Sequence, residues 1–253
     1  SLGYDILTYK TVRSCERRSY ELPNLQPIAW DGGKVPEGLS VASKMNGSWA
    51  VSFGMPSKSP SFWRNDVAAT RSHLDKGKFL CVSVVATAQD GWLIDDIADD
   101  YAQCAKWAAG SGANGVEANF SCPNVSSVDG QLFLNPTDAG IVAAKMREAI
   151  PNTPLLLKVG HIENREIAHA LLESVAVFAD ALVMVNGVSA KVRKPNGGFL
   201  FEGQCRGIAG EAIRETALEQ LNLFDGLIRE FGFDVRLVGV GGLCQATDVR
   251  ACL

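Results

Sequence analysis

The stretch "GVEANFSCPN", residues 115–124, begins as an apolar strand and ends in a cluster of polar and reactive side chains. Asn119, Ser121, Cys122 and Asn124 follow directly on residues that a sheet would bury. Such a strand end is typical of α/β proteins, because catalytic and binding side chains collect where parallel strands end. The fold therefore depends on what the rest of the chain places beside this stretch.

Five further apolar runs are interpreted as strands, at residues 4–10, 78–87, 154–160, 179–187 and 235–242. They are continuous rather than alternating, as expected for parallel strands that are covered on both faces. Amphipathic helices are predicted between them, at residues 95–110, 135–150, 163–178 and 215–232. This alternation predicts βα units around a parallel sheet, and we assign the chain to the TIM (β/α)₈ barrel class.

The composition excludes several classes of protein. The chain of 253 residues has a net charge of −4, and its Lys and Arg residues are scattered singly, so nucleic acid is not an expected partner. No apolar run approaches the roughly 20 residues of a membrane span. The seven cysteines form no C-x-x-C pair and the three histidines no H-x-x-x-H motif. This usage indicates reduced thiols in a cytoplasmic protein, without disulfides or a metal centre.

Residues 11–77 depart from the βα rhythm. They contain "PNLQPIAWDGGKVPEG" and "FGMPSKSPSFW", which are rich in Pro, Gly, Ser and aromatic residues. Long excursions inside compact domains are usually functional. We therefore predict a single domain over residues 1–253, in which 11–77 form one extended connection draped over the end of the barrel.

Polar side chains recur where the predicted strands end. Lys10 and Thr11 end the first strand, Lys158 the fourth, Asn186 the fifth and "GVGG" (239–242) the last. Because the carboxyl ends of barrel strands open onto one face, these residues predict an active site there. Each lysine alone has an alternative interpretation as a snorkelling side chain.

Two glycine-rich stretches, "RGIAG" (206–210) and "GVGG" (239–242), indicate a phosphate-bearing cofactor. The chain has no GxGxxG and no GxxxxGK[ST] motif, so neither a Rossmann site nor a P-loop is predicted. Cys122 is a candidate nucleophile or general base. No motif places His73, His161 or His169 beside it, as a cysteine hydrolase would require.

"NFSCPN" (119–124) resembles the N-x-S-C-P-N signature of the class 1 dihydroorotate dehydrogenases, which are TIM-barrel flavoproteins related to the flavin domain of dihydropyrimidine dehydrogenases. Other family-like motifs follow in the family's order. They are "TYKT" (8–11), "VSFGMPS" (51–57), "LLLKV" (155–159), "VNGVSA" (185–190) and "GVGG" (239–242).

The resemblance implies an FMN-dependent oxidoreductase of pyrimidine biosynthesis that converts dihydroorotate to orotate. Cys122 would take the C5 proton, while the C6 hydride passes to N5 of FMN. Lys10 is implied as a second catalytic residue, near both substrate and flavin. The other flavin contacts implied are Thr11, Asn119, Lys158 and Val188, with phosphate contacts at Gly207, Gly241 and Gly242. The substrate contacts implied are Phe53, Gly54, Met55, Asn119, Asn124 and Ser189. A cytoplasmic homodimer with an electron acceptor such as fumarate would follow, or an NAD-linked enzyme with a partner subunit.

The chain departs from the family pattern at two substrate positions. Val51 and Ser189 stand where the family has asparagines, and Ala190 replaces a serine. These changes leave open a different pyrimidine or a small unsaturated acid as substrate. A non-catalytic barrel that binds a phosphate-bearing ligand is the third alternative. The six predicted strands correspond to the family's second to seventh, so its first and eighth strands are expected outside this sequence.

Overall fold

The computed structural model, described over residues 3–121 and 131–252, is built around a parallel sheet. Its strands lie in the order β1 (Ile6–Val12), β5 (Phe79–Val84), β6 (Gly115–Asn119), β7 (Leu155–Lys158), β8 (Ala181–Met184) and β11 (Arg236–Gly239). Every neighbouring pair is parallel. The six strands predicted from the sequence are confirmed. Within the described residues the sheet is open, with β1 and β11 at its two edges.

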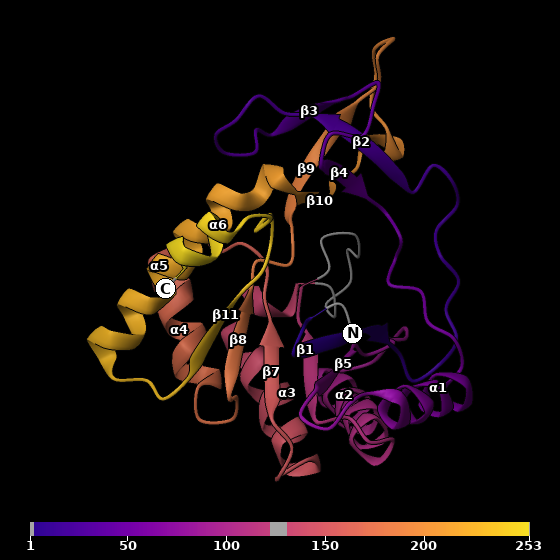
Figure 1. The fold of residues 1–253 in the computed structure, drawn as a ribbon, viewed down its shortest axis with the longest axis vertical. Coiled ribbons are helices and arrows are strands. Elements are labelled where there is room, and N and C mark those ends of the chain that lie inside the picture. The colour runs from indigo at the N-terminus through magenta and orange to yellow at the C-terminus, as the bar shows by residue number, and fades with distance from the viewer. Residues whose placement is uncertain (1–2, 122–130, 253) are drawn as a thin grey trace.

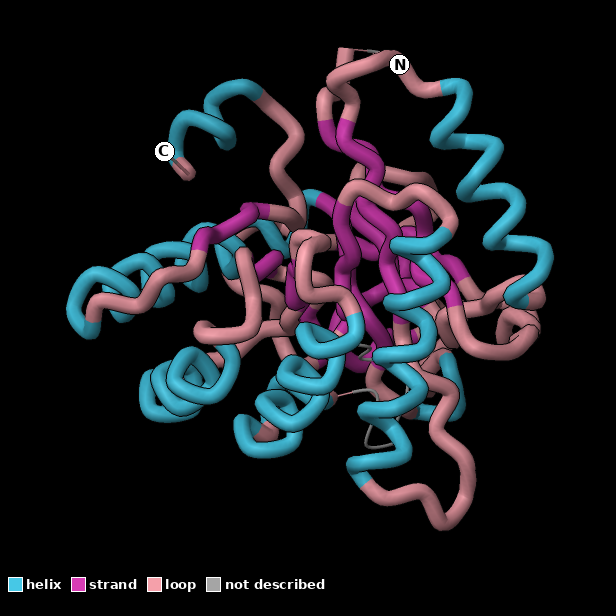
Figure 2. Tube along the Cα trace, turned by 90° about the horizontal axis from the view of Figure 1, so that it is seen from below, coloured by secondary structure: helices cyan, strands magenta, loops and turns pink. Residues whose placement is uncertain are grey.

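Four long helices pack against the outside of the sheet, and Figure 2 shows cyan helices beside the magenta strands. They are α2 (Ile94–Gly110), α3 (Pro136–Ala149), α4 (Arg165–Val175) and α5 (Arg214–Phe231), and they confirm the four predicted helices. Local signals set their ends. The Asn164 side chain caps the start of α4, and Gly232, with φ of 71°, ends α5 in the left-handed conformation.

A second, smaller unit lies over the carboxyl ends of the parallel strands (Figure 1). Strands β2 (Leu25–Ala29), β3 (Gly38–Val41) and β4 (Ser48–Val51) combine with β9 (Val188–Arg193) and β10 (Arg206–Gly210) in a closed five-stranded barrel. This small barrel has its own core, which includes Ile28, Leu39, Ala50, Val192 and Ile208. Two segments far apart in the sequence are thus joined in one structure.

The small barrel changes the interpretation of residues 11–77, for which the sequence predicted only an extended connection. Strands of four or five residues, broken by Pro and Gly, carry too little periodicity to be recognised alone. Their partners β9 and β10 lie more than a hundred residues later in the chain. The stretch also contains helix α1 (Pro60–His73), which the prediction missed because only Trp63 and Val67 are buried.

The remaining elements are short. They are the 3₁₀ turns η2 (Leu132–Leu134), η3 (Phe201–Gly203) and η4 (Glu211–Ile213), and helix α6 (Ala246–Ala251). Among the helices of the described ranges, none has both the length and the apolar character needed to cross a bilayer.

Gly210 should be required for the junction between the small barrel and α5. Its φ is 88°, and a Cβ there would lie 2.0 Å from the Gly47 carbonyl oxygen. We expect Gly210→Ala to lower the free energy of unfolding by about 3 kcal/mol or more, because strain and overlap add. Gly33 is the control, since its φ is 76° but no atom lies within 4 Å of the added Cβ. Gly33→Ala should lose about 1 kcal/mol. Equal losses in urea unfolding would contradict the prediction.

Candidate active site

A cavity of about 240 Å³ lies between the ends of the parallel strands and the small barrel. Lys10, Thr11, Asn119 and Asn186 supply its polar side chains. The opposite wall carries no polar side chain and is formed by Val51, Phe53, Gly54, Met55, Pro56, Gly207, Ile208 and Ala209. Seven of the residues predicted for the site are therefore brought together here: Lys10, Thr11, Phe53, Gly54, Met55, Asn119 and Gly207.

Asn119 is held by a chain of hydrogen bonds across neighbouring strands. Its Nδ2 donates to Thr11 Oγ1 at 3.2 Å, and Thr11 Oγ1 lies 3.0 Å from Ser83 Oγ. Nδ2 also lies 3.5 Å from Met55 Sδ, while Oδ1 accepts from the Ser121 amide at 3.2 Å. The amide is buried, so these contacts fix its orientation and join the strand ends to residues 53–57.

Lys10 reaches from β1 to the loop that follows β4. Its ammonium donates to the Thr11 carbonyl at 2.9 Å and to the Pro56 carbonyl. Partial burial of this end of the side chain lowers the pKa of Lys10, and the positive charge of Arg13 acts in the same direction. The lysine therefore anchors the loop at 53–57. It also loses its proton at a lower pH than an ordinary lysine does.

The sequence prediction missed Arg13, which is fully buried. Its Nε donates to the Met55 carbonyl at 3.0 Å and its Nη1 to the Ala86 carbonyl. The Arg13 backbone donates to Ser57 Oγ at 3.1 Å and accepts from Trp63 Nε1 at 3.0 Å. One side chain thus ties β1, the 53–57 loop and the end of β5 together. An arginine directly after an apolar strand was the only sequence signal.

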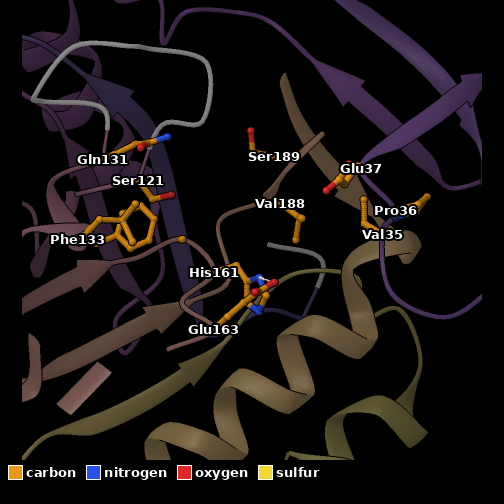
Figure 3. Close-up of a pocket in the computed structure, with 13 residues that line it drawn as sticks. Val35, Pro36, Glu37, Ser121, Gln131, Phe133, His161, Glu163, Val188 and Ser189 are labelled. Carbon is orange, nitrogen blue, oxygen red and sulfur yellow. Dashed lines mark ion pairs between the residues drawn. The ribbon is translucent and has the colours of Figure 1, made fainter. Parts of the chain in front are cut away.

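A second cavity, of about 320 Å³, shares Gly187 with the first. Figure 3 shows residues that line this second cavity. Val188 and Ser189, predicted to contact flavin and substrate, line this cavity with Ser121 and His161. Burial lowers the pKa of His161, although Glu163, 3.9 Å from the imidazole Nδ1, opposes that shift. Asn186, which lines the first cavity, donates to the Ser121 carbonyl in the second. The two cavities are therefore adjacent parts of one region.

The two positions that depart from the family pattern lie in one row of the small barrel. Gly207 of β10 pairs with Val51 of β4 on one side and with Ser189 of β9 on the other. Directly paired residues of antiparallel strands present their side chains to the same face. Val51 and Ser189 therefore flank Gly207 on one face of the small barrel.

Lys158 does not line either of these cavities. It pairs in register with Asn119, and its ammonium lies 3.7 Å from Oε1 of Glu117. Both residues line a space of about 1130 Å³ on the inner face of the open parallel sheet. Lys158 therefore lies beside Asn119, at the end of the neighbouring strand, with its side chain on the inner side of the sheet.

The turn after β11 is fixed by two glycines. Gly241 has φ of 101° and Gly242 φ of 71°. A Cβ on Gly242 would lie 2.7 Å from the Gly210 carbonyl oxygen and 2.8 Å from the Arg214 backbone nitrogen, the first residue of α5. No side chain caps α5 at its start. A glycine turn beside a helix N-terminus is a favourable place for an anion, and these residues fit a phosphate group.

Cys122 and Asn124 lie outside the described residues. The cysteines within the described ranges are free thiols: Cys15, Cys81, Cys104, Cys205, Cys244 and Cys252. Burial, reinforced by Glu117, raises the pKa of Cys81 to about 12, and burial raises the pKa of Cys104 as well. Neither thiol is suited to act as a base near neutral pH. In the same part of the chain, no group of His, Cys, Asp and Glu side chains could hold a metal ion.

Comparison with known proteins identifies the family. The model of the dihydroorotate dehydrogenase family matches residues 52–252. The chain belongs to the dihydroorotate dehydrogenase family. The dihydroorotate dehydrogenase of Dictyostelium discoideum is 29% identical over 96% of this chain and 70% of its own length. The catalytic subunit of dihydroorotate dehydrogenase B (NAD(+)) from Pelobacter propionicus is 31% identical over 53% of this chain.

A solved dihydroorotate dehydrogenase also matches in fold. The Eimeria tenella enzyme, crystallised with ferulenol, superposes with a TM-score of 0.73 over 96% of this chain at 12% identity. This likeness confirms that the open parallel sheet has the fold of the TIM-barrel dihydroorotate dehydrogenases. The chain spans 65% of the Eimeria protein and 42% of the Pelobacter subunit.

Arg13 should control the order of the 53–57 loop. We expect Arg13→Met to speed amide hydrogen exchange in residues 53–57 and to lower the free energy of unfolding by about 2–3 kcal/mol, because two carbonyls lose a charged donor. Arg18, which is exposed in the same region, provides the control variant Arg18→Met. Exchange that is equally slow in both variants would show that other contacts hold the loop.

Proposed function

We propose that this chain carries the FMN-dependent active site of a dihydroorotate dehydrogenase, which oxidises dihydroorotate to orotate. The observation that supports it best is the hydrogen-bonded set of Thr11, Ser83 and Asn119, with Lys10 beside it, at the ends of three adjacent parallel strands. This set faces the 53–57 loop across a small cavity. Polar side chains at strand ends are where barrels of this kind act on ligands.

The residues fit an FMN group in two respects. The turn at Gly241 and Gly242 beside the start of α5 suits the ribityl phosphate, with Gly207 as a third glycine on the adjoining strand. Lys10, Thr11, Asn119, Lys158 and Val188 would contact the ring system. When bound, FMN would supply the acceptor for the hydride that leaves C6 of the substrate.

The chain's own residues would bind the substrate and move the proton. Cys122 would accept the C5 proton, because a thiolate is a competent base once its surroundings tune it. Asn119 and Asn124 would pair with polar groups of the ring, while Phe53, Gly54 and Met55 cover it and Ser189 contacts its far side. The fixed amide of Asn119 would orient the substrate without further reorganisation.

A second substrate class has specific support. Val51 and the apolar side chains of Met55 and Ile208 leave one wall of the cavity without a hydrogen-bonding side chain. A buried ring amide facing this wall would lose its partners, which is unfavourable. We therefore keep a small unsaturated acid or a less polar pyrimidine as the alternative substrate, on the same fold and flavin.

The proposed function predicts a yellow protein whose flavin is bleached by substrate. We expect dihydroorotate to reduce bound FMN in a stopped-flow experiment, and fumarate, NAD or a quinone, mixed in turn, to identify the electron acceptor. Cys122→Ala should slow flavin reduction by about 10²–10⁴-fold through loss of the base, with FMN still bound. Cys15→Ala, at an exposed thiol, should reduce normally. If the flavin is reduced only by the saturated form of another unsaturated acid, the alternative substrate is the correct one.

Lys10 predicts an alkaline limit to substrate binding. Its pKa is lowered by burial and by Arg13, so the positive charge is lost at a lower pH than for an ordinary lysine. The KM for an anionic substrate should therefore rise as the pH increases through that lowered pKa. Lys10→Arg should remove this rise because a guanidinium stays charged. A KM profile that is unchanged by the substitution would show that another group titrates.

A further inference from the structure

A buried carboxylate lies inside the parallel sheet, beneath the proposed site. Glu117 is the central residue of β6, and all residues of that strand are buried. Its Oε1 is inaccessible to solvent and accepts no hydrogen bond within the described residues. Burial of an ionised carboxylate without compensation is strongly unfavourable. The residue therefore needs a nearby positive charge.

Lys158 supplies that charge. Its ammonium lies 3.7 Å from Glu117 Oε1, and its side chain is 23% exposed. The other ionisable groups around the same space are differently engaged. Cys81 is neutral because its pKa is raised to about 12, and Arg147 pairs with Asp180 at 2.5 Å. Arg236 and Asp234 also line the space, near the amino ends of the strands. Glu117 and Lys158 thus compensate one another.

The two charged groups are close to one another but are not hydrogen-bonded. At 3.7 Å they attract electrostatically, yet the separation exceeds that of an ordinary hydrogen bond. Within the described residues, Lys158 donates no hydrogen bond to another group. The carboxylate therefore attracts the ammonium, while the N–H donors of the ammonium stay available to a ligand beside Asn119.

We propose that Glu117 is a positioning residue whose charge holds the Lys158 ammonium in place and directs it toward the flavin ring. This inference rests on the proposed function, in which Lys158 contacts FMN. A purely structural role explains the pair poorly, because barrel interiors are normally filled by branched apolar side chains such as the neighbouring Leu156 and Val183. An apolar pair of similar volume would also stabilise the sheet at least as well.

The test is Glu117→Gln, which removes the charge with little change of shape. Two properties would be measured: the pKa of Lys158, by NMR of reductively ¹³C-methylated protein with the signal assigned through Lys158→Arg, and the Kd for FMN against pH, by quenching of flavin fluorescence. We expect the pKa of Lys158 to fall by about one unit or more, because a compensating charge is lost. FMN affinity should then drop about tenfold at alkaline pH and change little near pH 6.

Two further variants keep the outcome interpretable. Glu117→Asp retains the carboxylate and should restore both the Lys158 titration and the pH profile, even if it is less stable. Glu148→Gln removes an exposed carboxylate from α3 and should change neither property.

Three results would contradict the inference. The first is an unchanged Lys158 titration in Glu117→Gln. The second is a titration that moves without any change in FMN affinity, which would make the pair structural. The third is a wild-type protein that binds no FMN. That result would overturn the proposed function as well, whereas the first two leave it intact.

Discussion

The pairing of β4 with β10 is the interaction on which the geometry of the site depends. It joins residues 48–51 to residues 207–210 in an antiparallel ladder, so two distant parts of the chain form one wall. The same junction continues into the start of α5, because Ser48 Oγ accepts from the Ala212 amide and the Gly47 carbonyl from the Glu211 amide. Gly242 then packs against the Gly210 carbonyl. One ladder thus places the cavity wall, the helix N-terminus and the glycine turn together.

The parallel sheet and the small barrel contribute different chemistry to the cavity between them. The strand ends supply Lys10, Thr11 and Asn119. A hydrogen bond between strands links Thr11 to Asn119, and Lys10 donates to the Thr11 and Pro56 carbonyls. The small barrel supplies apolar side chains and backbone. Arg13 connects the two, because its guanidinium reaches the Met55 and Ala86 carbonyls from the end of β1. Arg13 therefore fixes the polar strand ends relative to the apolar wall of the cavity.

The sequence predicts the parallel part of this architecture well and the small barrel poorly. Continuous apolar runs and capped amphipathic helices are local signals, so β5, β6 and α2 were recognised with small errors at their ends. Strands β2 to β4 are short, and their stability comes from partners in residues 188–210, which no local pattern reveals. In the site, strand-end lysines and amides were apparent, whereas Arg13 and Glu117 were not. Their importance arises from burial, which depends on tertiary packing.

Under the proposed function, the division between the two units would also separate reaction from specificity. The residues proposed to contact the flavin belong mainly to the ends of parallel strands, where hydrogen bonds link Asn119 to Thr11 and Ser121, and Thr11 to Ser83. Val51 and Ser189 instead lie on the small barrel, on either side of Gly207, which has no side chain to lose. The side chains at positions 51 and 189 can therefore change without altering the polar side chains at the strand ends. Under the proposed function, the family pattern is kept at the strand ends that would contact the flavin and altered at two positions that would face the substrate.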